Sequence, residues 1–375
     1  MKNILLHTPE GVRDIYGNEF AGKLKAEKAI QEKLNGYGYE DIQTPTFEFF
    51  DVFSKEIGTT PSNELYKFFD KEGNTLVLRP DFTPSIARCA AKYYMDESAP
   101  IRFCYMGNTF TNTNNLQGKL KEVTQMGAEL MNDGSVEADG EIIALVVESL
   151  LAAGLKDFQV SIGEVEYFKG ICEEFGIPED TVDDLRELIS NKNLFGAEEL
   201  LRERGITAEA REKISKISDL FGNVDTLAEA EKQVNNKRSQ KAIQRLKDLY
   251  EVLCSYGVAR YVSFDLGMLS KYHYYTGVIF KVYTYGVGDA IVKGGRYDEL
   301  LGYFGKQAPA IGFVVVIDDL LLALERQDGT YEEKAEVQKL FYQKEHYEDV
   351  LKQAQELRRQ GKRVALIPEK DGEQK

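Results

Sequence analysis

The most informative stretch of the sequence contains Tyr274-Tyr-Thr-Gly-Val-Ile-Phe280, followed by Gly294-Gly-Arg-Tyr-Asp-Glu-Leu300. The first segment joins a tyrosine pair to an apolar run with the β-branched and aromatic residues typical of a strand. The second supplies a Gly-Gly turn next to charged residues. Together they predict the wall of a small-molecule pocket. Two of the chain's three histidines lie outside residues 269–301, so we do not expect a histidine-based catalyst there.

The composition is that of a globular protein with two or three domains. The chain has 375 residues, of which 43% are hydrophobic and 29% are charged, so each domain can form its own core. The net charge of −15 disfavours nucleic acid as a partner, because an acidic surface repels a phosphate backbone. The nearest approach to a basic block, residues 237–247, is interpreted as a solvated helix face.

The sequence indicates neither a membrane anchor nor a metal site. The apolar run at the N-terminus is too short for a signal peptide, and no window approaches the roughly 20 apolar residues that span a bilayer. The four cysteines form no Cys-x-x-Cys pair, so zinc ligation is unsupported. We therefore expect a cytoplasmic protein with reduced thiols, no metal and no cofactor.

Periodicity and turn residues predict the order of the elements. Helices are expected at residues 17–37, 80–94 and 136–153, and strands at 67–79 (a hairpin), 101–110, 121–131 and 158–163. Asp81 or Thr83 is expected to cap the second helix. Further strands are expected at 262–264, 276–283 and 290–293, then a helix at 319–325 and a strand–helix–strand tail at 337–342, 346–360 and 363–367.

The same pattern predicts three parts. Residues 1–165 and 256–325 are expected to form the core. Residues 166–255, where strand signals vanish and charged residues recur at helical spacing, are expected to form a helical insert. Residues 326–375 are expected to form a linker and the short tail.

Strand 121–131 leaves one question open. Gln125 and Glu129 share one face of it, because side chains alternate along a strand. That face is either a pocket wall, where both polar groups need hydrogen-bond partners, or a face exposed to solvent.

Six segments, in order, resemble the catalytic domain of histidyl-tRNA synthetases over roughly residues 5–325. They are His7-Thr-Pro-Glu-Gly-Val-Arg-Asp14, Gly38-Tyr-Glu-Asp-Ile-Gln-Thr-Pro-Thr-Phe-Glu48, Leu78-Arg-Pro-Asp-Phe-Thr-Pro84, Thr124-Gln-Met-Gly-Ala-Glu-Leu130 and the two segments quoted above. The resemblance implies an α+β fold, a class II aminoacyl-tRNA synthetase-like antiparallel sheet flanked by helices, with a helical insert and a short α/β C-terminal tail. It also implies a self-dimer through the first long helix and the strand after it.

Function does not follow from fold, so the groups that activate an amino acid with ATP need a separate check. Synthetases of this family use three arginines, whose guanidinium groups stabilise charge on the reacting phosphate. This chain has Thr111, Ser270 and Asp319 at those positions, and Val316 where the family has Gly. Removing one such donor typically costs a factor of about 10²–10³ in rate. We therefore expect no catalytic residues for adenylation.

By the same resemblance, the amino-acid half of the pocket is better kept. The residues implied for a histidine-like ligand are Asp81, Thr83, Gln125, Glu129, Tyr274 and Tyr275. The first three match positions around the ligand ammonium, although the family has Glu at Asp81. Glu129 and Tyr275 match the pair that brackets an imidazole, and a carboxylate and a phenol can hydrogen-bond its opposite nitrogens. The alternative is that the two tyrosines are core aromatics.

A synthetase-like chain without these arginines is similar to the regulatory subunits of ATP phosphoribosyltransferase. His273, where the synthetases have Asp, favours this branch. The resemblance implies a non-catalytic subunit that a short-form catalytic subunit needs for activity and for feedback inhibition by histidine, in the first step of histidine biosynthesis. Free histidine is a candidate ligand. The tail resembles only the first strand–helix–strand of an anticodon-binding domain, which argues against tRNA.

Two other functions stay open from the residues alone. The chain would be an active histidyl-tRNA synthetase if another arginine reached the ATP site, and Arg79, Arg102 and Arg296 are the candidates. We expect all three to be strand and turn residues instead. The chain would be a synthetase-like pseudoenzyme of another complex, such as a kinase regulator or an amide-forming enzyme, if the histidine-specific segments had lost their meaning.

Overall fold

The computed structural model describes residues 6–53, 60–113, 120–269, 274–328 and 337–369. These residues divide into two compact units, residues 6–14 with 23–328, called the large unit, and residues 15–22 with 337–369. Residues 337–369 of the second unit are called the small unit, and each unit is described by itself. The helices and strands of the sequence prediction are found in the predicted order, with ends that differ by a few residues.

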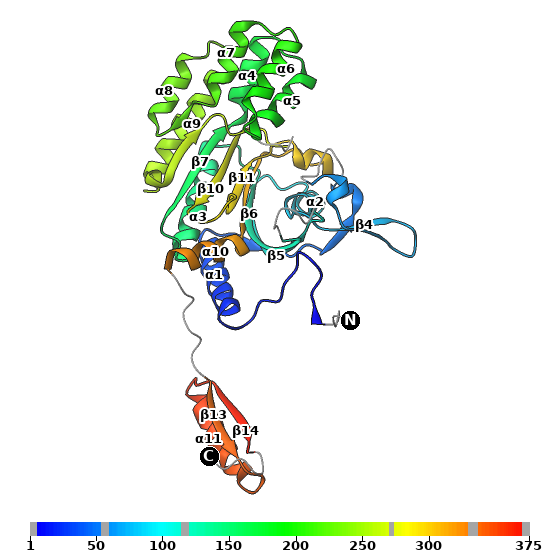
Figure 1. Cartoon of the computed structure of the whole chain (residues 1–375), viewed down its shortest axis with the longest axis vertical. Helices are drawn as coiled ribbons and strands as arrows, with labels where there is room; N and C mark the ends of the chain where they lie inside the picture. Colours follow the sequence, from blue (N-terminus) through cyan, green and yellow to red (C-terminus); the bar gives the residue numbers. More distant parts are fainter. Residues whose placement is uncertain (1–5, 54–59, 114–119, 270–273, 329–336, 370–375) are drawn as a thin grey trace. The chain divides into compact units, whose positions relative to one another are not determined.

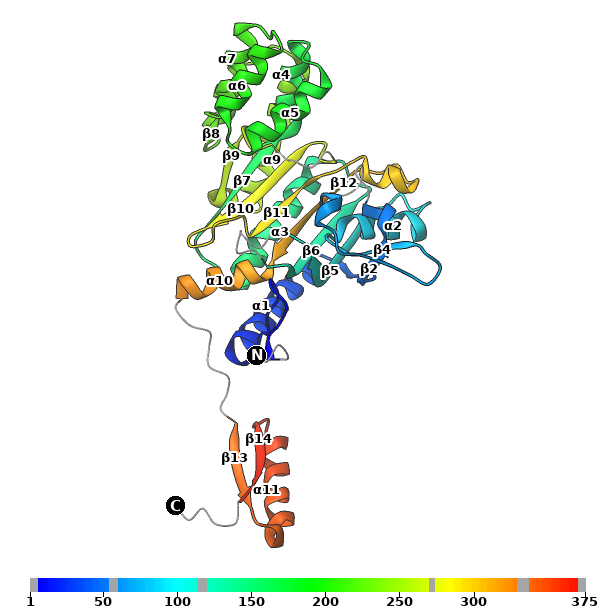
Figure 2. The same ribbon diagram turned by 45° about the vertical axis from the view of Figure 1, so that its right-hand side comes forward.

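A nine-stranded sheet forms the centre of the large unit (Figure 1). Its strands are β1 (Glu40–Asp41), β5 (Ile101–Phe110), β6 (Glu122–Met131), β7 (Phe158–Glu164), β8 (Phe221–Gly222), β9 (Val262–Asp265), β10 (Val278–Thr284), β11 (Val292–Arg296) and β12 (Ala310–Val316). Their order across the sheet is β1-β5-β6-β12-β11-β10-β7-β9-β8, and Figure 2 shows the central strands side by side. The predicted antiparallel sheet is confirmed, with two parallel pairs, β1 with β5 and β7 with β9.

Helices cover this sheet, and the most deeply buried of them is α3. The core helices are α1 (Gly17–Gly36), α2 (Thr83–Tyr93), α3 (Val136–Ala152) and α10 (Ile317–Asp328), and short 3-10 helices lie at Phe50–Phe53, Ser62–Glu64, Ala259–Tyr261 and Leu300–Phe304. Apolar side chains of α3, such as Ile142, Leu145 and Val146, are fully buried. A helix that is apolar on most of its surface is expected to lie inside the core rather than on it.

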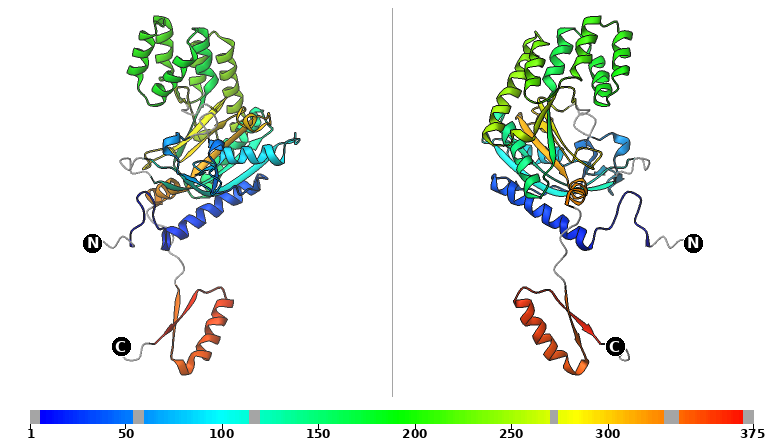
Figure 3. Two further views of the ribbon diagram at one scale, coloured as in Figure 1. Left: turned by 90° about the vertical axis from the view of Figure 1, so that its right-hand side faces the viewer. Right: turned by 60° about the vertical axis from the view of Figure 1, so that its left-hand side comes forward.

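The chain between β7 and β9 is mainly helical, and its helices gather at one end of the sheet (Figure 3). They are α4 (Val165–Glu174), α5 (Glu179–Ser190), α6 (Leu194–Glu203), α7 (Ala208–Ile217), α8 (Asp225–Lys232) and α9 (Lys237–Ser255). The expectation that this segment has no strand was wrong in one place, because Phe221 and Gly222 pair with the edge strand β9. Two residues are too few to give a period in the sequence.

A second, three-stranded sheet precedes α2. It consists of β2 (Phe47–Phe49), β3 (Lys67–Phe69) and β4 (Thr75–Leu78), in the order β2-β4-β3 with antiparallel neighbours. The predicted hairpin is the pair β3 and β4. Phe47, Phe49 and Phe68 share one face of this sheet by register and are more than a third exposed.

The small unit is a strand–helix–strand. Its strands β13 (Gln338–Tyr342) and β14 (Val364–Pro368) are parallel, and α11 (Tyr347–Arg359) connects them after a short 3-10 helix at Lys344–His346. Among its described residues, Ala354 is the one fully buried apolar side chain. The predicted tail is therefore present as a unit with very little core of its own.

No helix in the described parts of the chain combines the length and apolar character needed to cross a bilayer. All four cysteines carry free thiols.

Candidate ligand-binding site

Glu129 lies at the centre of the predicted pocket. It is on β6 and is 1% exposed, and a carboxyl group is buried only at high cost unless it has partners. The Thr83 hydroxyl donates to Glu129 Oε1 at 2.7 Å, and the Tyr297 hydroxyl donates to Oε2. The solvent-face alternative for Glu129 is therefore wrong. Its two oxygens are held by groups from α2 and from the segment after β11.

Two glycines on neighbouring strands make room for this arrangement. Gly312 on β12 pairs with Glu129, and a Cβ there would collide with the Glu129 carboxylate. Gly295 on β11 pairs with Gly312, and a Cβ there would lie 2.7 Å from Cε1 of Tyr275. The close approach of a carboxylate and an aromatic ring to the sheet thus requires glycine at both positions.

Three tyrosines lie near Glu129, in the segment before β10 and in the segment after β11. The rings of Tyr274 and Tyr275 lie with centroids 4.5 Å apart, and Tyr274 also meets Tyr297 edge to face at 5.9 Å. Tyr275 packs against a buried cluster that includes Ile279, whereas Tyr274 packs against the cluster that contains Phe82. Both tyrosines thus lie near Glu129 and its partners. Both also have the apolar packing that the core-aromatic alternative predicts.

The start of α2 supplies Thr83, and the loop before it supplies Asp81. The expectation that one of them caps α2 was wrong: Phe82 occupies the N-cap without a side-chain cap, and Pro84 in the first turn has no N–H to offer. Instead, the Thr83 N–H donates to Asp81 Oδ1 at 3.2 Å, and the Thr83 hydroxyl is directed to Glu129. The local turn therefore aims the hydroxyl into the pocket.

Gln125 lies two residues along the same face from Gly127, which faces the Tyr105 hydroxyl. Among the described residues, Gln125 Oε1 is buried and has no hydrogen-bond partner. The buried Tyr105 hydroxyl lies close enough to lower the pKa of Glu129, yet it too has no partner of normal hydrogen-bond geometry in the described part of the chain. Polar atoms left unsatisfied in the interior are costly, so this side of the pocket is suited to a ligand that donates hydrogen bonds.

Burial dominates the electrostatics of the site. It raises the pKa of the Glu129 carboxyl from 4.5 to about 8, the hydrogen bonds from Tyr297 and Thr83 oppose that rise, and the charge of Asp81 adds to it. Burial and the neighbouring Glu129 carboxyl raise the pKa of Tyr297 as well. The surroundings of Glu129 therefore favour its protonated form at neutral pH, and a cationic ligand would reverse that preference.

Tyr297 was not among the residues predicted for the site, although it stands in the quoted Gly-Gly-Arg-Tyr segment. The sequence did point to this tyrosine, because the Gly-Gly-Arg-Tyr segment was predicted to form part of a pocket wall. The direction of its side chain could not be predicted from the local sequence, because its partner Glu129 is 168 positions away in the chain.

The positions expected to lack arginine carry other contacts. Thr111 follows β5, and its N–H donates to the Lys121 carbonyl. Asp318 and Asp319 form the first turn of α10, where the helix dipole favours acidic groups, and Asp318 Oδ2 accepts the Thr124 N–H at 2.8 Å. Ser270 lies outside the described residues.

The three arginines considered as substitutes are held elsewhere. Arg79 donates to the backbone carbonyls of Asn108 and Thr44. Arg102 forms a bidentate pair with Glu141 on α3 at 3.0 Å. Arg296 is buried and forms ion pairs with Asp139 and Asp298. In the described residues, no group of three His, Cys, Asp or Glu side chains is placed to hold a metal ion.

The geometry can be set beside known proteins. The family model described as histidyl-tRNA synthetase matches residues 11–320. An ATP phosphoribosyltransferase regulatory subunit from Ruminiclostridium cellulolyticum is 42% identical over 359 residues, which is 96% of this chain and 86% of that protein. One from Thermoanaerobacter pseudethanolicus is 37% identical over 362 residues, covering 96% of this chain and 94% of that protein.

Solved structures agree with this placement. The crystal structure of an ATP phosphoribosyltransferase regulatory subunit/histidyl-tRNA synthetase from Bacillus halodurans is 33% identical, with a TM-score of 0.89 over 98% of this chain and 94% of that one. A histidyl-tRNA synthetase from a Nostoc species is 22% identical, with a TM-score of 0.80 over 97% of this chain and 86% of that one, which shows the fold alone. The predicted class II aminoacyl-tRNA synthetase-like fold is confirmed.

The raised pKa of Glu129 predicts how stability depends on pH. Because the folded state holds this proton more tightly than the unfolded state, the contribution is fully present below about pH 4.5 and is lost as pH rises through about 8. Glu164 is also buried with a pKa of about 8 and acts in the same direction. Glu129→Gln should reduce the fall in unfolding free energy between pH 5 and 8 by up to about 1.4 kcal/mol per pH unit.

Urea unfolding at several pH values measures this slope. Glu164→Gln is the matched variant and should remove a similar part, so that the double variant has a smaller slope than either single variant. An unchanged slope in Glu129→Gln would mean that the carboxyl is ionised in the folded protein.

Proposed function

The chain belongs to the family of ATP phosphoribosyltransferase regulatory subunits, and we propose that it is the non-catalytic subunit on which a short-form catalytic subunit depends for activity and for inhibition by histidine. The reaction of the catalytic subunit is the first step of histidine biosynthesis. A biosynthetic role of this kind implies that the protein is located in the cytoplasm. The observation that carries the proposal is the buried Glu129 carboxyl, held by the hydroxyls of Thr83 and Tyr297, together with two carboxylates, Asp318 and Asp319, at the start of α10.

Those carboxylates weigh against amino-acid activation. Adenylation needs positive groups against the ATP phosphates, and a carboxylate at that place repels them. The candidate substitutes do not help, because Arg102 is committed to Glu141 and Arg79 to backbone carbonyls. An active synthetase with rearranged ATP contacts is therefore disfavoured. The curated relatives also weigh against a pseudoenzyme of an unrelated complex.

The pocket would hold histidine in a defined direction. In this proposal the imidazole lies between Glu129 and Tyr275, over the glycines of β11 and β12. The ammonium group faces Asp81 and Gln125, whose buried Oε1 is an acceptor in need of a donor. A protonated imidazole would also supply the positive charge that Glu129 lacks among its present partners, Thr83 and Tyr297.

A self-dimer is the third part of the proposal, with the first long helix and the strand after it as the interface. Phe47 and Phe49 of β2 are 53% and 56% exposed, and the ring of Phe68 on β3 meets that of Phe47 edge to face at 5.8 Å. Contiguous exposed aromatic groups of this kind mark interaction surfaces. A second copy of the chain is the occupant that the synthetase-like core implies.

The activity test uses two assays on the purified chain. Histidine-dependent exchange between ATP and pyrophosphate should be lower than that of a histidyl-tRNA synthetase by at least about 10⁶, since three donors are missing at about 10²–10³ each. Addition of the chain to a short-form catalytic subunit should restore phosphoribosyl transfer. Ordinary exchange, or no stimulation of the catalytic subunit, would contradict the proposal.

The pocket is tested by calorimetric titration of histidine into the chain, alone and with the catalytic subunit. Glu129→Gln should weaken binding about 10- to 100-fold, the range for loss of a charged hydrogen bond, because an amide N–H₂ would face the hydroxyl donors of Thr83 or Tyr297. Glu141→Gln is the control, since its Arg102 pair lies outside the pocket. Equal affinity of both variants would place histidine elsewhere.

The dimer is tested by light scattering during gel filtration. Phe49→Glu should give a monomer, because a carboxylate buried in an apolar contact has no partner. Phe341→Glu is the control, since Phe341 of the small unit is also 56% exposed but lies outside the proposed interface. A dimeric Phe49→Glu variant would rule out this face.

A further inference from the structure

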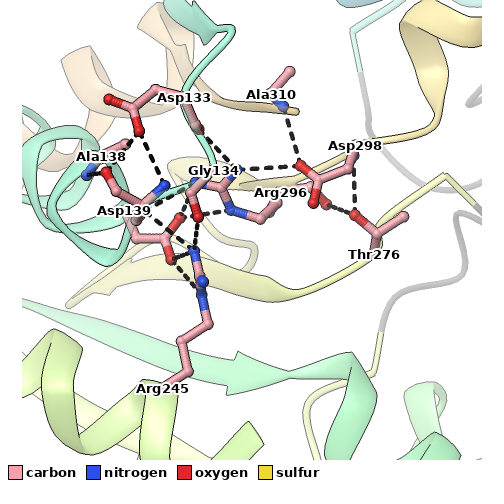
Figure 4. A network of polar contacts seen from close by, with 10 residues as sticks. Asp133, Gly134, Ala138, Asp139, Arg245, Thr276, Arg296, Asp298 and Ala310 are labelled. Carbon is pink, nitrogen blue, oxygen red and sulfur yellow. Dashed lines mark hydrogen bonds and ion pairs between the residues drawn. The ribbon is translucent and has the colours of Figure 1, made fainter. Parts of the chain in front are cut away.

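Arg296 is the most highly connected polar residue beside the pocket. It ends β11, between Gly295, on which the Tyr275 ring lies, and Tyr297, which donates to Glu129. Its side chain is 3% exposed and points away from the pocket into the network drawn in Figure 4. Its neighbours in the chain, Gly295 and Tyr297, contact groups of the proposed ligand site, whereas its own charge is paired with Asp139 outside that site.

The Arg296 guanidinium is fully engaged. Nε and Nη2 both donate to Asp139 Oδ1, at 2.8 and 2.6 Å. Nη1 donates to Asp298 Oδ1 at 3.1 Å and to the Asp133 carbonyl at 3.0 Å, and Nη2 donates to the Ser135 carbonyl at 3.3 Å. A planar fork held at so many points has one available orientation, so β11 is fixed at this end.

Asp139 on α3 is shared between two arginines. Its other oxygen, Oδ2, accepts from Nε of Arg245 at 2.8 Å and forms an ion pair with Nη2 at 2.6 Å. Arg245 belongs to α9 of the helical segment, and its Nη2 also donates to the carbonyls of Gly134 and Ser135, both at 3.1 Å. One fully buried carboxylate thus links the central sheet to the helical segment.

The helices that carry this link are in very close contact. Gly140 follows Asp139 on α3, and a Cβ there would collide with Cγ1 of Val252 on α9. Two packed helices without slack transmit a shift at one end rather than absorbing it. Movement of α9 would therefore carry α3 and Asp139 with it and strain the pair that Asp139 forms with Arg296, which is costly because both groups are buried.

The other end of the array reaches the pocket through the backbone. The Arg296 carbonyl accepts the Thr276 N–H at 2.8 Å, and Thr276 follows Tyr275 directly. The Thr276 hydroxyl in turn accepts the Asp298 N–H at 2.9 Å. A second contact from the helical segment lies nearby, since Ser190 at the end of α5 donates to the Leu269 carbonyl at 2.9 Å.

From these contacts we infer that Arg245, Asp139 and Arg296 form a positioning array that couples the helical segment to the histidine pocket. Tyr275 and Tyr297 can close on a ligand only in the arrangement that Arg296 maintains. Arg296 is in turn held by the carboxylate of Asp139, whose charge Arg245 of α9 helps to neutralise. By linkage, a ligand that favours this arrangement also favours the matching position of α9. The inference rests on the proposed pocket and adds how its occupancy is passed on.

The test is calorimetric titration of histidine into three variants of the full chain. Arg245→Met removes the charge and keeps the apolar stem, and it should weaken histidine binding about tenfold, within the usual range of coupling between sites. Arg245→Lys should recover part of that loss. Arg238→Met is the matched control, because Arg238 is on the same helix but pairs with Glu166 and Glu173 of α4, and it should bind as the wild type does.

A second readout separates coupling from general stability. Histidine should slow amide hydrogen exchange along α9 in the wild type and in Arg238→Met, and should have no such effect in Arg245→Met. If Arg245→Met fails to fold by circular dichroism, an intermediate affinity and partial protection in Arg245→Lys carry the test.

The outcomes are distinguishable. Wild-type affinity in Arg245→Met and Arg245→Lys, or equal protection of α9 in all variants, would overturn the array while the pocket stands. Failure of the wild type to bind histidine at all would overturn the pocket and the array together.

Discussion

The buried ion pair between Arg296 and Asp139 is the constraint on which the pocket geometry depends. Both side chains are almost completely excluded from solvent, so neither can lose its partner without leaving an uncompensated charge in the interior. Such a pair adds little to stability compared with apolar packing of the same volume. What it provides is a single register for the end of β11. Since Tyr297 follows Arg296 and the Arg296 carbonyl holds Thr276, that register places the tyrosines on both sides of the site.

Glu129 illustrates a different use of burial. Among the described residues its carboxyl is held by two hydroxyls, and its pKa is raised to about 8 by desolvation. A chain selected only for stability would place an apolar or amide group there. Local choices that oppose stability are concentrated at functional sites. The unsatisfied Oε1 of Gln125 on the same face belongs to the same pattern. Burial of these two polar groups is costly, and a donor-rich cation beside them would offset that cost.

The sequence predicted the helices and strands well, because long segments such as 136–153 and 101–110 have clear periods of their own. The sequence predicted less well which way individual side chains point. Alternation placed Gln125 and Glu129 on one face without deciding which face was buried, and Tyr297 was left out of the site. Two-residue β8 had no period to detect. The contact of Arg296 with Asp139 joins residues 157 positions apart, and neither residue differs in its surroundings from an ordinary exposed charge until the sheet brings them together. Local patterns determine elements, whereas sites are made by distant pairs.

These observations bear on how a synthetase-like pocket can act without catalysis. An enzyme must bind a transition state more tightly than its substrate, which in adenylation requires positive groups at the reacting phosphate. A sensor has a weaker requirement, since it needs only different affinities for a ligand in two arrangements of the protein. A ligand with equal affinity for both shifts nothing, however tightly it binds. The pocket around Glu129 can supply affinity, but a difference in affinity needs a physical connection to a part that moves. The carboxylate of Asp139, held by one arginine of the sheet and one of α9, is such a connection.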